Sequence, residues 1–183
     1  MLDKETAKKA IVRLAELAKR RQINLHLTVY GGTVMMLAYN ARLGTKDIDA
    51  IFRPRDEIIP IIEEVAKEMN LDSNWLNDDV KVWVAEDERG ALIEFREMAE
   101  FCHGLSVKRP SAKYLLAMKA RAGRLPLPGQ KGDYDDIVFL LRHTQTNSVD
   151  AVNKLVEKHF LGDCLSEKNR AILEVALKDA FPS

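Results

Sequence analysis

The stretch VYGGTVMMLAYNARLGTKDIDAIF, residues 29–52, constrains this chain more than any other. Two adjacent glycines, Gly31 and Gly32, end one apolar run, and Asp47 and Asp49 flank a single isoleucine inside a second run. Alternation along INLHLTVY predicts a strand that ends in a tight turn, and DIDAIF predicts a second strand. We expect the glycines and the aspartates to meet at the carboxyl ends of neighbouring strands, either as ordinary turn and strand residues or as a site for a charged ligand and a metal.

Helices are predicted around these two strands. Apolar residues recur at helical spacing from Lys4 to Arg21, and residues 53–70 repeat that pattern despite Pro60. Thr33 to Asn40 favours a short helix between the strands. The first part of the chain is therefore predicted in the order helix, strand, helix, strand, helix.

The later part of the chain changes from mixed to almost entirely helical. VKVWVAE and ALIEFREM predict two strands that the charged turn DERG joins as a hairpin. LSVKR predicts a short strand that ends at Pro110, where Ser111 can cap the helix SAKYLLAMKARAGR. We therefore predict a mixed α/β domain over residues 1–106 and a helical domain over residues 107–183.

Composition and charge argue against several classes of protein. The 183 residues carry 28 basic and 28 acidic side chains, so no global charge favours a long nucleic acid as partner. Cys102 and Cys164 have no second cysteine at zinc-site or redox spacing. The N-terminal segment lacks the apolar core of a signal peptide, and no later stretch could span a bilayer. We expect a cytoplasmic protein without a membrane partner.

The two aspartates form a plausible metal platform. Side chains alternate along a strand, so Asp47 and Asp49 point to one face while Ile48 packs into the core on the other. Two carboxylates on one face repel each other unless a cation joins them. Oxygen ligands at that separation suit Mg²⁺ or Mn²⁺, which take a few carboxylates together with substrate phosphates.

The glycines supply what a phosphate requires. Without Cβ atoms, Gly31 and Gly32 let the backbone approach a phosphate, and the helix that follows offers N–H groups and a positive dipole end. Thr33 adds a hydroxyl at the same helix start. A glycine pair alone is usually a turn and a DxD alone is usually a solvated pair, but their combination in this order favours a functional site.

A family resemblance is carried by three consecutive features: the turn Gly31-Gly32-Thr33, the helix that follows it, and the segment Thr45-Lys46-Asp47-Ile48-Asp49. They resemble the glycine-rich turn and the metal-binding strand of nucleotidyltransferases of the DNA polymerase β superfamily. The form GGT…TKDIDAIF is most similar to the AbiEii-type, toxin-like branch. The resemblance implies an α/β (α+β) nucleotidyltransferase fold, in which helices flank a small mixed sheet and the C-terminal half is helical.

The resemblance also implies an activity. An enzyme of this kind uses Mg²⁺ or Mn²⁺ to move an NMP group from an NTP to an acceptor hydroxyl, on RNA such as tRNA or on a protein. Asp47 and Asp49 would hold the metal and act as catalytic residues, and the nucleotide would contact Gly31, Gly32, Thr33, Lys46 and Lys119. Many members are toxins of toxin–antitoxin pairs, so a cognate antitoxin is an expected protein partner.

The helical half supplies further candidates. SAKYLLAMKARAGRLPLPGQKGDYDDIVFLLR resembles the later AbiEii-type pattern, which implies that Lys119 reaches the triphosphate and that Asp136 lies near the active site, in a cleft between the two domains. A solvated Lys119 whose stem covers core surface is an equally open interpretation. Asp133 has the position of an N-cap, and Lys131 is either a phosphate contact or a solvated side chain.

A third metal carboxylate is expected in many superfamily members. By order along the chain Glu94, in LIEF, is the candidate, although alternation alone does not turn its face toward Asp47. Asn77 and Asp78, in a polar loop, are candidates to line the site, and Trp75 is predicted as a core anchor.

Two other functions share these features. A binding module with the same fold would bind a nucleotide or a protein without transfer, and a small-molecule adenylyltransferase would differ only in its acceptor. The balanced charge argues mildly against a large RNA acceptor.

Overall fold

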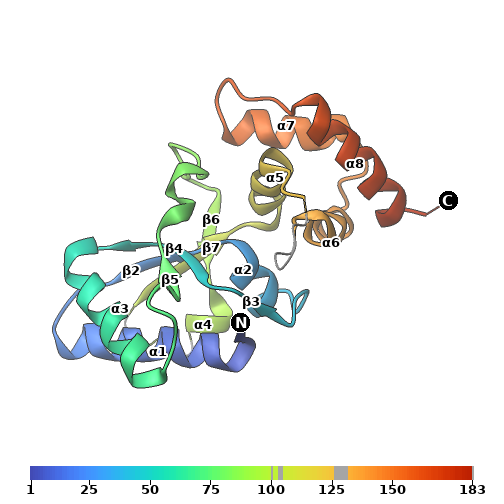
Figure 1. Ribbon diagram of the computed structural model, residues 1–183. Coiled ribbons are helices and arrows are strands. Elements are labelled where there is room, and N and C mark those ends of the chain that lie inside the picture. The colour runs from blue at the N-terminus through green and yellow to red at the C-terminus, as the bar shows by residue number, and fades with distance from the viewer. Residues whose placement is uncertain (100, 103–104, 126–131, 183) are drawn as a thin grey trace. The chain divides into compact units, whose positions relative to one another are not determined.

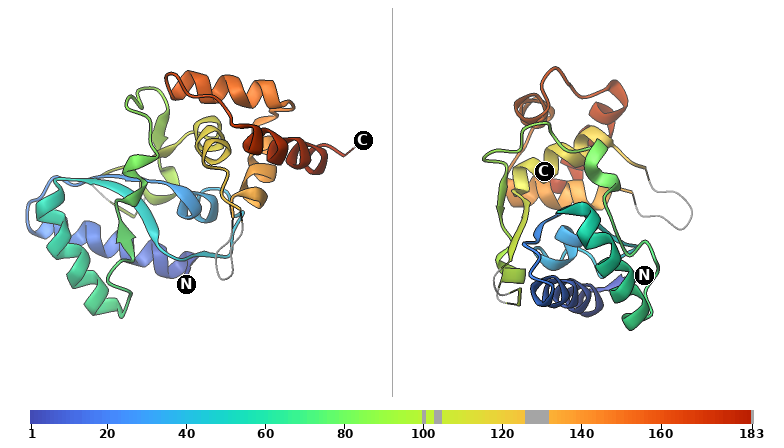
Figure 2. Two further views of the ribbon diagram at one scale, coloured as in Figure 1. Left: turned by 45° about the horizontal axis from the view of Figure 1, so that its top comes forward. Right: turned by 90° about the vertical axis from the view of Figure 1, so that its left-hand side faces the viewer.

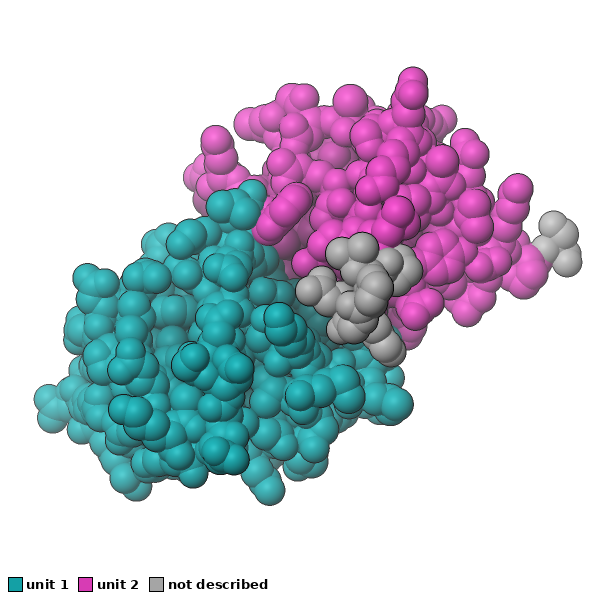
Figure 3. Space-filling view, viewed as in Figure 1, with its two compact units in different colours: residues 1–82, 93–109 teal, residues 83–92, 110–183 magenta. Residues whose placement is uncertain are grey.

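The chain forms two compact units. A computed structural model describes residues 1–99, 101–102, 105–125 and 132–182. Unit 1 comprises Met1–Val82 and Ile93–Arg109, and unit 2 comprises Trp83–Leu92 and Pro110–Ser183 (Figure 3). The main division thus lies three residues later than the predicted 106/107 boundary, and the segment 83–92 joins the second unit instead of the first.

Hydrogen bonds explain why the segment 83–92 belongs to unit 2. The backbone N–H of Ala85 donates to the Tyr114 hydroxyl at 2.8 Å. The Ser111 N–H donates to the carbonyl of Ala91, also at 2.8 Å. Both ends of the segment are therefore attached to the start of the helical part of the chain.

Unit 1 is built on a mixed sheet with the strand order β5-β4-β2-β7-β6. Central strand β2 pairs antiparallel with β4 and parallel with β7, while β4 pairs parallel with β5. A separate small sheet joins β1 and β3 in antiparallel register. The strands are β1 (Leu2–Asp3), β2 (His26–Val29), β3 (Gly44–Thr45), β4 (Ile48–Arg53), β5 (Leu76–Asn77), β6 (Leu92–Glu94) and β7 (Ser106–Pro110).

Two long amphipathic helices cover this sheet, as predicted. Their apolar faces pack against each other beneath the strands in the view of Figure 1. Trp75 is buried, and its indole N–H donates to the Ile62 carbonyl at 3.1 Å, which confirms it as a core anchor. The helices of unit 1 are α1 (Lys4–Arg20), α2 (Gly31–Leu37), α3 (Arg55–Met69) and α4 (Arg96–Ala99).

The predicted hairpin of VKVWVAE and ALIEFREM is wrong. A 3₁₀ turn, η1 (Asp79–Val82), replaces the first strand, and only β6 remains of the second. The Asn77 side-chain oxygen accepts the Asp79 N–H at 3.0 Å, and such local bonds compete with sheet pairing. Val82 is exposed, so the apolar alternation of this segment does not mark a buried face.

Unit 2 is a helical assembly in which α5 packs against the other three long helices (Figure 2). The predicted cap of α5 is confirmed, because the Ser111 hydroxyl accepts the Tyr114 N–H at 3.3 Å. Ser148 and Ser166 cap the following helices in the same way. The helices are α5 (Ala112–Ala122), α6 (Tyr134–Thr144), α7 (Val149–His159) and α8 (Glu167–Ala180).

The protein therefore has a mixed α/β architecture with a helical C-terminal part, as the sequence predicts. Among the described residues, no helix combines the length and the apolar content that a membrane span requires.

Candidate functional site

The glycines and the aspartates of the opening motif meet in unit 1. In the antiparallel register of β2 and β4, Val29 lies opposite Ala50. The end of β2, which leads into the glycines, is therefore beside the start of β4, which carries Asp49; Asp47 lies in the bend directly before β4. The predicted meeting at two carboxyl ends is wrong, because antiparallel pairing places the carboxyl end of one strand beside the amino end of the other.

Gly31 lies directly against Asp49. A Cβ built on Gly31 would be 2.7 Å from Asp49 Oδ2, and the Gly31 backbone has a φ of +60°. Both observations favour glycine, since side chains rarely adopt that φ and a Cβ would have to displace the Asp49 carboxylate. The Tyr30 N–H donates to the Asp49 carbonyl at 2.8 Å and fixes the approach. Helix α2 starts at Gly31, two residues before the predicted start.

Two threonine hydroxyls shape the turn that presents Asp47. Thr45 Oγ1 donates to the Asp47 carbonyl at 3.0 Å, and Thr33 Oγ1 approaches the same oxygen at 3.4 Å. Thr33 is only 1% exposed, so its hydroxyl contacts Asp47 and does not face outward for a phosphate. Ile48 is fully buried while Asp47 and Asp49 are half-buried, in keeping with two carboxylates on one face.

Arg42 is a basic residue of this region that sequence analysis missed. A Cβ on Gly32 would be 3.2 Å from Arg42 Nη1 and 3.0 Å from Thr45 Oγ1. The guanidinium therefore lies beside the glycine turn, whereas Lys46, the predicted basic residue, is exposed. The signal available in the sequence was the place of Arg42 in the short loop that connects the glycine helix to the aspartate strand.

Asn77 lies beside Asp49 on the neighbouring strand. Parallel strands β4 and β5 pair Asp49 with Asn77. Asn77 is 8% exposed, although its sequence context predicted a loop residue. Asp78 is instead engaged with Arg55 at 3.0 Å and with Lys81 at 3.3 Å. The guanidinium of Arg55 holds the pKa of the Asp78 carboxyl below its usual range.

Glu94 is not brought to the aspartates. It lies on edge strand β6, and strands β2 and β7 separate β6 from β4. Three strand spacings amount to roughly 14 Å, which is too far for a shared ion. Within the described part of the chain, no three His, Cys, Asp or Glu side chains gather closely enough to hold a metal. The candidate site therefore has two carboxylates, Asp47 and Asp49, and Glu94 is not a third.

The candidates of the helical part form a buried charge cluster in unit 2. Lys119 Nζ lies 2.8 Å from Asp133 Oδ1 and 2.6 Å from Asp136 Oδ2. Exposed fractions are 3% for Lys119, 2% for Asp133 and 1% for Asp136. A solvated Lys119 is therefore a wrong interpretation, because its ammonium is buried between two carboxylates.

Asp133 occupies the N-cap position of α6, but its side chain makes no cap hydrogen bond. Its carboxylate accepts from Arg124 Nε at 2.9 Å as well as from Lys119. The Asp133 N–H also donates to the Arg124 carbonyl at 2.8 Å. Asp133 thus joins α5, α6 and the chain that follows α5. Lys131, another candidate, lies outside the described residues.

Acid is expected to remove the stabilisation that Asp133 provides. Burial alone would raise its pKa, but Lys119 and Arg124 outweigh burial and hold the pKa of Asp133 below its ordinary range. Such a carboxylate stabilises the fold fully above its unfolded pKa of about 4. This stabilisation is lost as the pH falls through the lower, folded pKa.

We therefore expect the free energy of unfolding to fall more steeply in the wild type than in Asp133→Asn as the pH is lowered from about 5 to 2. Urea titrations at each pH measure this difference. Asp135→Asn, at an exposed neighbouring position, is the control and should retain the wild-type slope. Parallel curves for the wild type and Asp133→Asn would contradict the assignment.

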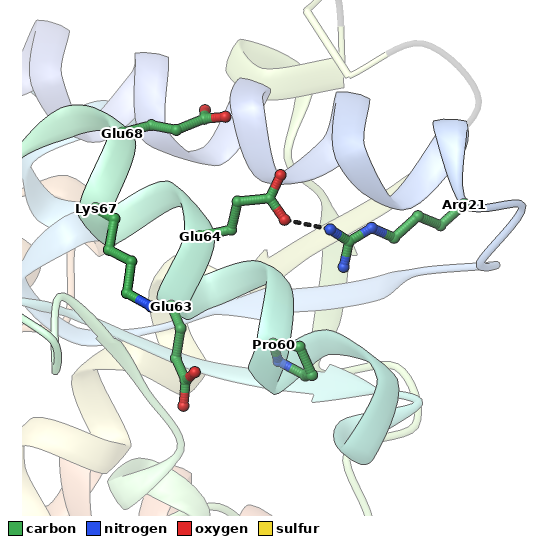
Figure 4. A pocket seen from close by; sticks show the side chains of 6 residues that line it. All are labelled: Arg21, Pro60, Glu63, Glu64, Lys67 and Glu68. Carbon is green, nitrogen blue, oxygen red and sulfur yellow. Dashed lines mark hydrogen bonds and ion pairs between the residues drawn. The ribbon is translucent and has the colours of Figure 1, made fainter.

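Two hollows on the surface of unit 1 contain none of the predicted site residues. One, of about 390 Å³, lies between the end of α1 and α3, where an ion pair joins Arg21 and Glu64 (Figure 4). The other, of about 540 Å³, is lined by side chains of α1 and α3, Met69 among them, together with Phe101. Acidic and basic side chains line both, so neither has the charge of one sign that a polyanion or a metal would require.

Neither a family model, nor a curated protein, nor a solved structure matches this chain. The function is therefore argued from the residues and their geometry.

Proposed function

We propose that this protein is a Mg²⁺-dependent nucleotidyltransferase whose metal and nucleotide phosphates bind unit 1 at Asp47, Asp49 and the two glycines. The observation that carries the proposal is the close approach of Asp49 Oδ2 to Gly31, 2.7 Å from where a Cβ would lie. A ligand that binds this carboxylate lies beside the Gly31 backbone, which has no side chain of its own. In this proposal the glycine turn and the aspartates contact the same ligand. Either motif alone would not require a ligand.

The residues present fit a divalent metal that arrives with a nucleotide. Mg²⁺ usually takes one or two protein carboxylates and fills its other positions with water and phosphate oxygens. Asp47 and Asp49 provide that number, and the described residues provide no third carboxylate beside them. When bound, Mg²⁺ supplies charge neutralisation of the phosphates and of the transition state.

Other side chains of unit 1 would bind and orient the triphosphate. Arg42 lies beside Gly32, and a guanidinium can donate two parallel hydrogen bonds to phosphate oxygens. Thr33 and Thr45 hold the turn that carries Asp47. Catalysis would come from positioning and from electrostatic stabilisation.

In the proposed reaction an acceptor hydroxyl attacks the α-phosphorus of the NTP in line. A bond forms between the acceptor oxygen and the α-phosphorus, the bond to the bridging oxygen breaks, and pyrophosphate leaves while the hydroxyl proton passes to solvent or to a base. The products are the nucleotidylated acceptor and pyrophosphate.

RNA such as tRNA, or a protein, is the proposed acceptor, and a toxin paired with a cognate antitoxin is the proposed biological role. Catalytic roles for Lys119 and Asp136 stay predictions of the resemblance.

The direct test is transfer of label from α-³²P NTPs to total tRNA or to cell extract. We expect the wild type to label an acceptor in the presence of Mg²⁺ and not in EDTA. Mg²⁺-dependent NTP binding without labelling of any acceptor would favour the non-catalytic binding module. Labelling of a small molecule, with no labelled RNA or protein, would favour the adenylyltransferase alternative.

Gly31→Ala is expected to reduce this transfer by about 100-fold, because displacement of a reacting group by an ångström has an effect of that size. The new methyl group must move the Asp49 carboxylate, which is the mobile end of a short side chain. The loss of stability should be smaller, about 1–2 kcal/mol for an alanine in the left-handed region.

Gly90→Ala is the matched control. Gly90 has a φ of +73° and no neighbour within 4 Å of its would-be Cβ, so it carries the same backbone cost without a collision. We expect Gly90→Ala to lose similar stability and to keep wild-type transfer. Equal transfer rates in the two variants would show that the approach of Gly31 to Asp49 is irrelevant to activity.

A further inference from the structure

Asn77 occupies the position beside Asp49 where a third metal carboxylate would be expected. The register pairs Ile48 with Leu76 and Asp49 with Asn77 on adjacent parallel strands. Paired residues of neighbouring strands have side chains on the same face, with about 5 Å between their Cα atoms. The side chain closest to Asp49 on strand β5 is therefore a neutral amide.

The orientation of this amide follows from one hydrogen bond. The backbone N–H of Asp79 is a donor, so the atom of Asn77 that lies 3.0 Å from it is the oxygen, Oδ1. The amide oxygen is the only side-chain atom of asparagine that binds a cation, and here it accepts the hydrogen bond of the turn that begins η1. The NH₂ group is the other arm of the amide and carries two donors, which suit an anion.

We propose that Asn77 contacts the ligand of this site as a hydrogen-bond donor to a phosphate oxygen of the nucleotide, and that it does not bind the metal. The inference rests on the proposed function of the Asp47–Asp49 pair. Its consequence is a site with two carboxylates instead of three. Metal binding by the protein alone is then weak, and the metal binds as a complex with the polyphosphate, whose oxygens complete its coordination.

Two substitutions separate the donor from the metal ligand. Asn77→Asp keeps an oxygen for the Asp79 N–H and places a second carboxylate oxygen where the NH₂ group was. Asn77→Ser keeps an oxygen acceptor for the turn but removes the NH₂ group. Asn74→Asp makes the same chemical change at an exposed position three residues away and is the control. Circular dichroism and thermal melting check that each variant is folded.

The measurements are Mn²⁺ binding followed by electron paramagnetic resonance, without nucleotide, and Mg²⁺·ATP binding followed by calorimetry. We expect Asn77→Asp to tighten Mn²⁺ binding by about tenfold or more, because affinity for such ions rises with the number of charged ligands. Asn74→Asp should leave Mn²⁺ affinity within about twofold, since exposed charges at that distance are screened. Asn77→Ser should keep wild-type Mn²⁺ affinity and weaken Mg²⁺·ATP binding by about tenfold, as loss of a hydrogen bond to a charged group predicts.

Each contrary result has a distinct meaning. Loss of Mn²⁺ in Asn77→Ser to the extent seen in Asp49→Asn would show that the amide oxygen is a metal ligand and would overturn the inference. Equal Mn²⁺ affinity in Asn77→Asp and Asn74→Asp would overturn it as well. A folded wild type that binds neither Mn²⁺ nor Mg²⁺·ATP would instead contradict the proposed function itself.

Discussion

Replacement of Asp47 and Asp49 together by asparagine is expected to lower label transfer by about 1,000-fold or more, since metal ions and preorganised charges each contribute several kcal/mol to such reactions. Asparagine preserves the size of each side chain and removes its charge, so the turn held by Thr33 and Thr45 through the Asp47 carbonyl should persist. The measurement is initial-rate labelling of the acceptor at saturating NTP and Mg²⁺.

Glu57→Gln/Glu63→Gln is the control for this experiment. It removes two charges from exposed positions of α3 and should retain full transfer. The toxin proposal adds a second readout, because wild-type expression should arrest growth while the Asp47→Asn/Asp49→Asn protein should not. Equal labelling by the wild type and the double variant would contradict the catalytic assignment. Harmless expression of an active wild type would contradict only the toxin role.

Elements whose signals are local were predicted well. The apolar spacing of α1, the alternation along β2 and the serine before α5 each act within a few residues, and each corresponds to an element or a cap of the structure. The pairing of Gly-Gly with Asp-x-Asp could also be anticipated, because the two motifs are separated by one short helix. The antiparallel pairing of β2 and β4 could not be derived from the sequence. Because of it, the glycines at the carboxyl end of β2 lie beside the amino end of β4 and not beside its carboxyl end.

Properties that depend on distant parts of the chain were mispredicted or missed. VKVWVAE has the alternation of a strand, but the Asn77 side chain starts a 3₁₀ turn there. Strand order is not encoded in order along the chain, so Glu94 was a candidate although two strands separate its strand from β4. Asn77 was treated as a loop residue because no sequence pattern shows that a two-residue strand pairs with β4.

The same limit explains the N-cap residue Asp133 and Asp136 of α6. Composition around Asp133 matches an N-cap, and only the fold shows that its carboxylate turns inward to Lys119 and Arg124. The sequence indicated that Lys119 needs an anion or solvent. In the structure the anions are carboxylates of its own unit, so Lys119 contributes to the stability of unit 2.

Lys119→Met is accordingly expected to lower the free energy of unfolding by about 3–5 kcal/mol, the usual cost of removing one partner from a buried ion pair. Methionine fills a similar volume, so the loss comes from leaving Asp133 and Asp136 buried without the ammonium that lies 2.8 and 2.6 Å from them. Arg124 still contacts Asp133 and limits the loss at that carboxylate. Urea denaturation followed by circular dichroism measures the change.

Lys113→Met is the matched control, because Lys113 lies on the same helix and is exposed. Its effect should stay within about 0.5 kcal/mol, as for most surface substitutions. A further variant, Lys119→Met/Asp133→Asn/Asp136→Asn, should recover much of the lost stability, because neutral amides are far less costly to bury than carboxylates that have lost the Lys119 ammonium. If Lys119→Met were as stable as Lys113→Met, the ammonium would not be needed to hold α5 and α6 together. If Lys119 acts only on stability, any folded Lys119 variant should keep full transfer. Activity of Lys119→Met, measured below its unfolding transition, therefore separates the structural role of Lys119 from the catalytic role that the resemblance implies.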